Sequence, residues 1–209
     1  MAILFTILGR GRAGRALASA WGDRVALLPA DASPGGPVLL AVPDRAIAAC
    51  AARFPGRCLH LSGSVHLDGV PSAHPLTSFD GHPADWTGTP LGLTGPAPPV
   101  ILDAFLDLGF VPFQLPAEHK ALYHACAVLT SCHASTLWLG ASALLAGAGV
   151  ELPGRGLFPL VEATARNIER HGPDGRTGPF VRGDAPTIAR DAAALPAAWR
   201  AVFLALGGL

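Results

Sequence analysis

Three glycines near the start of the sequence have a spacing that suits the binding of a phosphate chain. Gly9, Gly11 and Gly14 form G-x-G-x-x-G within the stretch FTILGRGRAGRAL. In such a loop the first glycine permits a sharp turn, the second lets the backbone approach an anion, and the third lets helix and strand pack closely. Free N–H groups at the helix start favour the anion. The loop predicts a dinucleotide site made of Gly9, Arg10, Gly11, Arg12, Ala13 and Gly14.

The residues around this loop leave the choice between NAD and NADP open. Asp31 lies 20 residues beyond Gly11, the spacing at which an acid binds the ribose of NAD, but it follows Pro29 in a loop. Arg10 and Arg12 could instead meet the 2′-phosphate of NADP, or they could be solvated. NADP is the favoured cofactor, with NAD as the alternative.

Polar residues also interrupt the most apolar part of the chain, residues 121–148. Lys120 and His124 are four apart and so share one face of a helix. At about 100° per residue, Ser131 and Ser135 fall within about 60° of Lys120. Unpaired buried polar groups cost about 1–3 kcal/mol, so this stripe either lines a wet cleft or bonds to neighbouring backbone.

In a cleft, these two residues could carry a reduction. Lys120 could protonate or polarise a carbonyl or imine while a hydride reaches its carbon, and His124 could relay the proton. A nicotinamide would then do the redox chemistry and the protein would orient it. The alternative is a solvated lysine at a helix end and a histidine satisfied in the core.

Further candidates follow predicted strands, at the edge where doubly wound sheets bind ligands. Val42, Pro43 and Asp44 end one strand, and Ser62 and Gly63 end the next. We expect these five residues to contact the cofactor or the substrate. The loop residue His74, just before a proline, is expected to face the cleft, whereas His60 belongs to a strand and is expected in the core.

Two candidates for substrate binding lie in the C-terminal half. Asn167 is on a predicted helix and is expected to face the cleft with Ser131 and His74. Arg182, in the stretch TGPFVRGD, either pairs with Asp184 in a turn or binds a substrate carboxylate as a bidentate fork. The His, Asp and Glu residues show no metal-ligand spacing, and we expect no metal.

Composition narrows the class of protein. The chain has 209 residues, half of them hydrophobic and 14% charged, with fifteen basic and fifteen acidic side chains. This balance predicts no nucleic-acid or membrane partner. The four cysteines form no C-x-x-C pair, which is typical of reduced thiols in a cytoplasmic protein. The N-terminus lacks a signal-peptide pattern, and we interpret the apolar stretch as a buried helix rather than a membrane span.

Apolar runs alternate with short helical patterns in the first half. Strands are predicted over 2–9, 24–28, 36–44, 57–63, 89–95 and 111–115. This alternation is typical of an α/β fold with a parallel sheet, and 66–99 reads mainly as a Pro- and Gly-rich loop. From residue 117 the patterns are all helical, with breaks at glycines and at Pro196. We predict two domains, 1–116 and 117–209.

Several short motifs occur together in one order. They are GRGRAGRAL, AVPD, HLSG, HPLTSF, KALYHACAVLTS and TGPFVRGDAPTI. In this respect the chain resembles the Rossmann-like bacterial proteins that carry the domain of unknown function 2520. These are similar in plan to pyrroline-5-carboxylate reductase, ketopantoate reductase and the 6-phosphogluconate dehydrogenase superfamily.

The resemblance implies an N-terminal NAD(P)-binding domain and an all-α C-terminal domain of 6-phosphogluconate-dehydrogenase type, which often dimerises. The active site would lie in the cleft between them. The superfamily often has a catalytic lysine at the start of the long helix with a polar partner one turn later, a pattern that Lys120 and His124 fit. Relatives usually have Ser-Asn where this chain has Ser131 and Cys132.

These observations lead to one main hypothesis and two alternatives. The main hypothesis is a homodimeric, NAD(P)-dependent oxidoreductase that reduces a small oxo or imino acid. The first alternative is a catalytically inactive dimer that binds a dinucleotide or a metabolite. The second is a structural dimerisation module without affinity for nucleotides.

Overall fold

The computed structural model describes residues 2–208, which divide into two compact units, Met1–Ala134 and Ser135–Leu209. All-helical structure begins before that division, at Ala117. The first turns of this helical region, residues 117–134, therefore belong to the same compact unit as the sheet.

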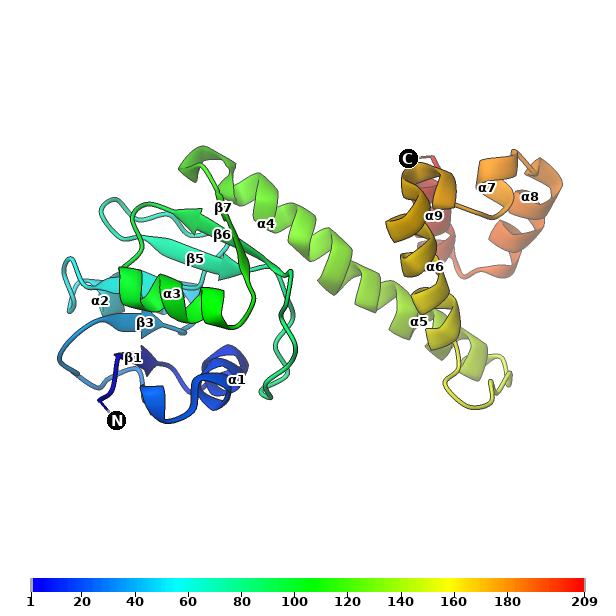
Figure 1. The fold of residues 1–209 in the computed structure, drawn as a ribbon. Coiled ribbons are helices and arrows are strands. Elements are labelled where there is room, and N and C mark those ends of the chain that lie inside the picture. Colours follow the sequence, from blue (N-terminus) through cyan, green and yellow to red (C-terminus); the bar gives the residue numbers. More distant parts are fainter. Residues whose placement is uncertain (1, 209) are drawn as a thin grey trace. The chain divides into compact units, whose positions relative to one another are not determined.

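The first unit is built on a seven-stranded sheet of order β2-β1-β3-β4-β5-β6-β7 (Figure 1). Neighbouring strands are parallel except for β5 and β6. The predicted α/β class with a mainly parallel sheet is thus confirmed. The strands are β1 (Phe5–Leu8), β2 (Val25–Leu28), β3 (Val38–Leu40), β4 (Cys58–His60), β5 (Ser72–Pro75), β6 (Pro90–Thr94) and β7 (Val111–Gln114).

Three helices cover the two faces of this sheet. Helices α1 (Arg12–Trp21) and α3 (Pro99–Asp107) pack on one apolar cluster, and α2 (Asp44–Ala51) packs on a second cluster on the other face. In β3, Leu39 belongs to the first cluster while Val38 and Leu40 belong to the second. This alternation explains why the central strands are apolar at every position, as expected for strands buried on both faces.

The sheet also corrects one sequence-based interpretation. Strand β5 lies in the segment that was expected to be mainly loop; it follows Pro71 and ends with Pro75. It forms because it is paired on both sides, with β4 at Ser72 and with β6 along all four residues. Pairing partners distant in sequence thus override the poor strand propensity of a Ser-Ala-His-Pro segment.

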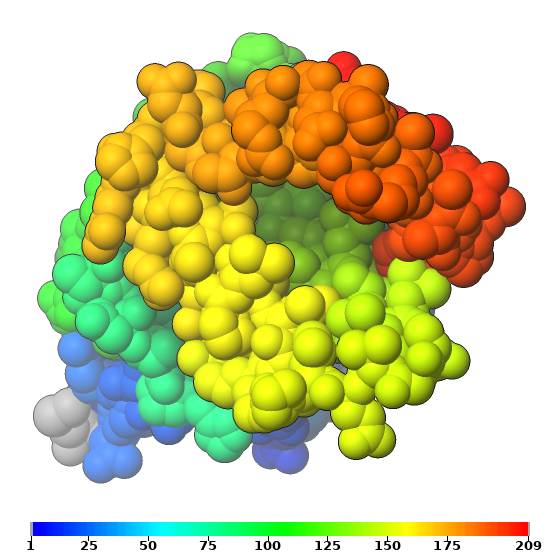
Figure 2. All heavy atoms as spheres, turned by 90° about the vertical axis from the view of Figure 1, so that its right-hand side faces the viewer, coloured from blue at the N-terminus to red at the C-terminus, as the bar shows by residue number. Residues whose placement is uncertain are grey.

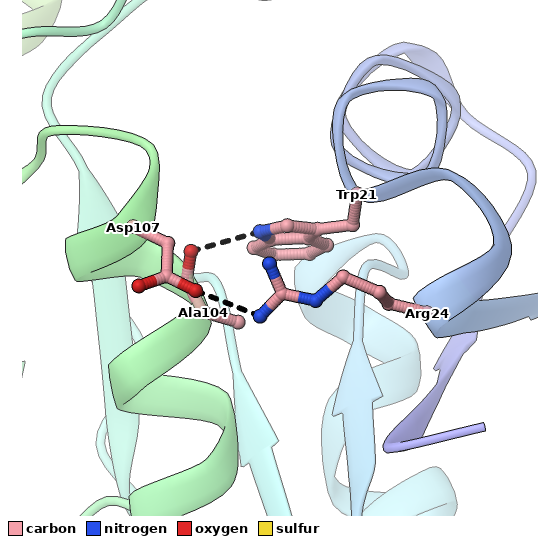
Figure 3. A network of polar contacts seen from close by, with 4 residues as sticks. All are labelled: Trp21, Arg24, Ala104 and Asp107. Atoms are coloured by element: carbon pink, nitrogen blue, oxygen red, sulfur yellow. Dashed lines mark hydrogen bonds and ion pairs between the residues drawn. The ribbon is translucent and has the colours of Figure 1, made fainter. Parts of the chain in front are cut away.

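A clamp holds α1 to α3 on the first face. The indole N–H of Trp21 donates to the Ala104 carbonyl at 2.8 Å, and the Arg24 guanidinium meets the Asp107 carboxylate at 2.7 Å (Figure 3). The Trp21 ring also packs edge-on against Phe105, with ring centres 5.1 Å apart. These contacts hold the C-terminal end of α1, and the 3-10 turn Gly22–Arg24 after it, against α3.

The long predicted helix is one continuous helical run with a change of register. It consists of the 3-10 turn Ala117–His119, α4 (Lys120–Val128), the π-helical turn Leu129–His133 and α5 (Ala134–Gly147). By length and composition it could cross a membrane, a test that core helices of soluble proteins also pass. The expectation that this stretch is buried is wrong for the single chain, since its apolar window is not buried.

The second unit is all helical, as predicted. Besides α5 it contains α6 (Phe158–His171), α7 (Pro179–Arg182), α8 (Ala185–Ala194) and α9 (Ala197–Gly207), with the expected break at Pro196. Figure 2 shows a hollow on this unit, which the structure defines as an apolar cavity of about 630 Å³ lined by α5, α6, α9 and the segment 176–181. We call this cavity the apolar hollow.

Candidate functional site

The glycine loop (Gly9–Gly14) connects β1 to α1, as the sequence predicts. Gly9 has φ 114°, and a Cβ there would collide with the carbonyl oxygen of Ala41 at the end of β3. A Cβ at Gly14 would collide with the carbonyl oxygen of Gly9. Both positions therefore require glycine for close packing, which matches the roles expected for the first and third glycines.

Gly11 differs from Gly9 and Gly14, because packing does not require a glycine at this position. It has φ −70° and no atom within 4 Å of a Cβ built on it. It precedes α1 without a side-chain cap, so the first N–H groups of α1 are not capped by the Gly11 position. The space beside Gly11 and the uncapped helix start suit an anion such as a diphosphate.

Candidates from several strands meet at the carboxyl edge of the sheet. Strand β1 lies between β2 and β3, so the chain order reverses beside the glycine loop, the place where such sheets bind ligands. A Cβ on Gly9 would also approach Val42, which follows β3. The Ser64 hydroxyl donates to the Asp44 carboxylate at 2.9 Å, which joins the segments after β3 and β4.

The loop after β2 is held by an arginine, although this does not decide between NAD and NADP. The Arg53 guanidinium donates to the backbone carbonyls of Ala30 and Asp31, both at 2.7 Å. Asp31 is exposed, as are Arg10 and Arg12. Both ribose-binding alternatives thus remain predictions.

Lys120 is buried, contrary to the alternative of a solvated helix-end lysine. Its side chain is 1% exposed, and its ammonium donates to the Ser62 carbonyl at 3.0 Å and to the Ser72 hydroxyl at 2.7 Å. Burial lowers the Lys120 pKa to about 8, an effect that Asp44 partly opposes. Lys120 therefore ties the start of α4 to the end of β4 and to β5.

His74 and His124 lie close together, and a third ring joins them. The His74 and His124 ring centres are 6.2 Å apart, and Tyr123 packs edge-on against His74 at 5.4 Å. The Tyr123 hydroxyl lies 2.9 Å from His74 Nδ1. Burial, followed by the nearby His124 and Lys120, lowers the His74 pKa to about 4, with Asp44 opposing. His74 is thus neutral at neutral pH.

These two histidines line a small pocket in the first unit, which we call the His74 pocket. Its volume is about 270 Å³. It is formed by the end of β5, the segment after it and the helical run from α4 into the π-helical turn. Its lining residues are His74, Leu76, Thr77, Ser78, His124, Ala127, Val128, Thr130 and Ser131.

The π-helical turn supplies one wall of the His74 pocket. π-turns inside α-helices occur frequently at functional sites. The Ser131 hydroxyl donates to the Ala127 carbonyl at 2.6 Å, and the Thr130 hydroxyl donates to the Cys126 carbonyl at 3.0 Å. Both hydroxyls therefore keep only lone pairs to offer to a ligand.

His60 lies in the core, as predicted. It is fully buried, and its Nδ1 accepts from the Ser62 N–H at 3.2 Å. Within residues 2–208, its Nε2 is a buried side-chain atom without a hydrogen-bond partner. Burial lowers the His60 pKa to about 4, and Lys120 adds to this effect.

The remaining candidates lie in the second unit and are exposed there. Asn167 is on α6 and Arg182 ends α7. Asp184 caps α8, accepting from the Thr187 N–H at 3.2 Å, and the described chain has no Arg182–Asp184 ion pair. The proposed turn pair is therefore wrong, while the substrate roles of Asn167 and Arg182 stay predictions. Residues 2–208 contain no group of three or more His, Cys, Asp or Glu arranged to hold a metal.

Sequence reasoning missed Tyr123, Ser72, Thr77 and Ser78. Tyr123 is the only tyrosine of the chain and directly precedes His124, which was the available signal. The other three lie in or next to β5, the strand that was read as loop.

A known protein family and several solved structures resemble this chain. A family model described as a domain of unknown function (DUF2520) matches residues 89–208. No curated protein matches the chain.

Several solved structures share the fold. A candidate NADP oxidoreductase from Bacteroides fragilis superposes with a TM-score of 0.78 at 18% identity, over 97% of this chain and 95% of that one. Protein TM1727 from Thermotoga maritima has a TM-score of 0.70 at 21% identity, over 90% and 88%. A reductive aminase from Aspergillus terreus, in complex with NADPH and ethyl levulinate, has a TM-score of 0.59 at 16% identity, over 100% and 92%. At these identities the likeness confirms the Rossmann-like fold with a helical second part.

Proposed function

The chain belongs to the family of the domain of unknown function 2520, and on this premise we propose that it is an NAD(P)-dependent oxidoreductase that reduces a small oxo or imino compound. The observation that carries the proposal is the glycine loop: packing requires Gly9 and Gly14 to be glycine, and Gly11 has open space where a side chain would begin. The candidate NADP oxidoreductase and the NADPH-bound reductive aminase of the same fold support it.

The residues of the first unit fit a dinucleotide. The backbone of Gly9–Gly14 would hold the diphosphate, and Val42–Asp44 with Ser62–Gly63 would line its path along the carboxyl edge of the sheet. NADP is favoured through Arg10 and Arg12, both exposed beside the loop, and NAD remains the alternative. When bound, the nicotinamide would supply the hydride.

The His74 pocket would hold the carbon that receives this hydride. Its 270 Å³ suit a small molecule. His124, half-buried at the pocket, would give a proton to the carbonyl oxygen or imine nitrogen as the hydride arrives. Lys120 was predicted to share this task, but its burial and two hydrogen bonds favour a positioning role for it.

We further propose that the protein is a cytoplasmic homodimer that associates through its helical unit. Large apolar side chains are exposed there, such as Leu139 at 70% and Leu160 at 66%, and contiguous exposed apolar surface marks interaction sites. Cys50, Cys58 and Cys126 are free thiols, in keeping with a reducing compartment.

The test of the proposed function uses a glycine pair with different packing. Gly11→Ala introduces no clash in the folded chain, so its melting temperature should match the wild type, yet the added methyl group should weaken NADPH binding by about tenfold or more. Gly9→Ala should lower the melting temperature as well, because its Cβ meets the Ala41 carbonyl. Binding is measured by NADPH and NADH fluorescence titration.

Two results would contradict the proposed function, one from this titration and one from a turnover assay. If the wild type binds neither dinucleotide below millimolar concentration, the nucleotide-free dimerisation module is the better description. If it binds a dinucleotide but transfers no hydride to any of a panel of oxo and imino compounds, the protein is better described as the catalytically inactive binding protein.

A further inference from the structure

The only tyrosine of the chain is joined to a histidine of the His74 pocket. The Tyr123 hydroxyl is 2.9 Å from His74 Nδ1. The Tyr123 ring also contacts Phe113 of β7, with ring centres 5.9 Å apart. Tyr123 is thus held by two strands, β5 and β7, and its hydroxyl is aimed at one nitrogen of His74.

The protonation states of both groups allow two directions for this hydrogen bond, from the phenol O–H to Nδ1 or from an Nδ1–H group to the phenol oxygen. Burial raises the Tyr123 pKa to about 12, so the phenol keeps its proton at neutral pH. His74 is neutral there, because burial, His124 and Lys120 lower its pKa and outweigh Asp44. A neutral imidazole has one N–H donor and one acceptor nitrogen. If the phenol O–H donates to Nδ1, the imidazole proton must be on Nε2.

The His74 ring also packs closely on the backbone. A Cβ at Gly63 would lie 2.9 Å from both Nε2 and Cδ2 of His74. The ring therefore packs directly on the Gly63 backbone, and its Nδ1 contacts the Tyr123 hydroxyl. These contacts restrict the orientation of His74, so a single tautomer would give the residue one defined N–H group at the pocket that it lines.

We propose that Tyr123 is a positioning residue that keeps His74 in the Nε2–H form, so that His74 donates one hydrogen bond to the carbonyl oxygen of a small substrate. This deepens the proposed function and rests on it, because the carbonyl is the group to be reduced. The Thr130 and Ser131 hydroxyls donate their protons to backbone carbonyls, so their oxygens can only accept hydrogen bonds from a ligand. The pocket thus fits a small carbonyl compound that carries its own O–H or N–H group.

The first experiment reads the tautomer without any ligand. Two-bond ¹H–¹⁵N NMR spectra of the ¹⁵N-labelled full chain distinguish Nδ1–H from Nε2–H imidazoles. His74→Gln assigns the signal, and Tyr123→Phe removes only the hydroxyl. The wild type should show a single Nε2–H form at about pH 7, and Tyr123→Phe should show a mixture of tautomers. An Nδ1–H form in the wild type, or an unchanged tautomer in Tyr123→Phe, would overturn the proposal.

The second experiment uses pyruvamide as the carbonyl probe together with NADP⁺, a pair that cannot react because pyruvamide has no alcohol or amine carbon that could give a hydride to NADP⁺. Pyruvamide should shift the His74 Nε2–H signal, and Tyr123→Phe should weaken its binding severalfold while NADP⁺ affinity stays the same. If NADP⁺ binds but the His74 signal does not move, the substrate contact is refuted and the proposed function stands. If no dinucleotide binds, the proposed function fails, and the tautomer spectra still decide the Tyr123–His74 pair.

Discussion

Lys120 shows how one side chain can combine positioning with a changed acidity. Its ammonium is enclosed between the Ser62 carbonyl and the Ser72 hydroxyl, where Asp44 is the carboxylate that acts on it. Removing a charge from water disfavours the charged form, which lowers the pKa of an amine. The same burial encloses the Lys120 ammonium among protein groups, which is why we propose a positioning role for Lys120 and proton donation by the half-buried His124.

The lowered pKa of Lys120 makes stability depend on pH. The unfolded chain holds the Lys120 proton up to its usual pKa of 10.5, whereas the folded chain releases it near 8. Between these values the unfolded state binds more protons, so the free energy of unfolding should rise as pH increases from about 8 to 10. Urea unfolding at several pH values measures this rise, which Lys120→Met should abolish. An equal rise in the variant would contradict the prediction.

At the scale of elements, helix α1 has to be placed so that its N-terminal end meets the carboxyl edge of β1. Gly9 and Gly14 allow that approach at one end, and the Trp21 and Arg24 clamp to α3 secures the other (Figure 3). The two bonds of the clamp differ in burial. The Trp21 bond is buried, whereas the Arg24–Asp107 pair is partly exposed.

We expect the two halves of this clamp to contribute unequally. Trp21→Phe leaves the buried Ala104 carbonyl without its donor and should lower the free energy of unfolding by roughly 1–3 kcal/mol. Arg24→Ala breaks an exposed pair and should cost less than about 1 kcal/mol. Urea denaturation of both variants compares them directly. A larger loss for Arg24→Ala would show that the ion pair, rather than the indole, holds α1.

At the scale of the whole molecule, the two units bury very different shares of their apolar side chains. The sheet unit holds nearly all the fully buried hydrophobic residues, among them Ile7, Leu39 and Phe105. The helical unit exposes large ones and contains the apolar hollow (Figure 2). Such a surface is typical of a protein that associates, and a second copy of this chain is the partner we propose.

Association should therefore depend on the helical unit. The wild type should sediment with twice the 21.4 kDa mass of one chain. Leu139→Glu puts a charge on the exposed face of α5 and should shift the equilibrium to monomers. Val111→Glu is the control, since Val111 is also an exposed large apolar residue (53%, against 70% for Leu139) but lies on β7 of the first unit. Dissociation by the control but not by Leu139→Glu would place the interface on the sheet unit.

The sequence by itself determined the features that depend on local pattern. Apolar runs predicted six of the seven strands, the glycine spacing placed the loop between β1 and α1, and Pro196 marked the break before α9. Only the tertiary structure decided what depends on partners distant in the chain. It made β5 a strand through pairing with β4 and β6, buried Lys120 against Ser62 and Ser72, and brought Tyr123 to His74, 49 residues away. Periodicity is encoded within one element, whereas burial and hydrogen-bond partners arise only when elements pack together.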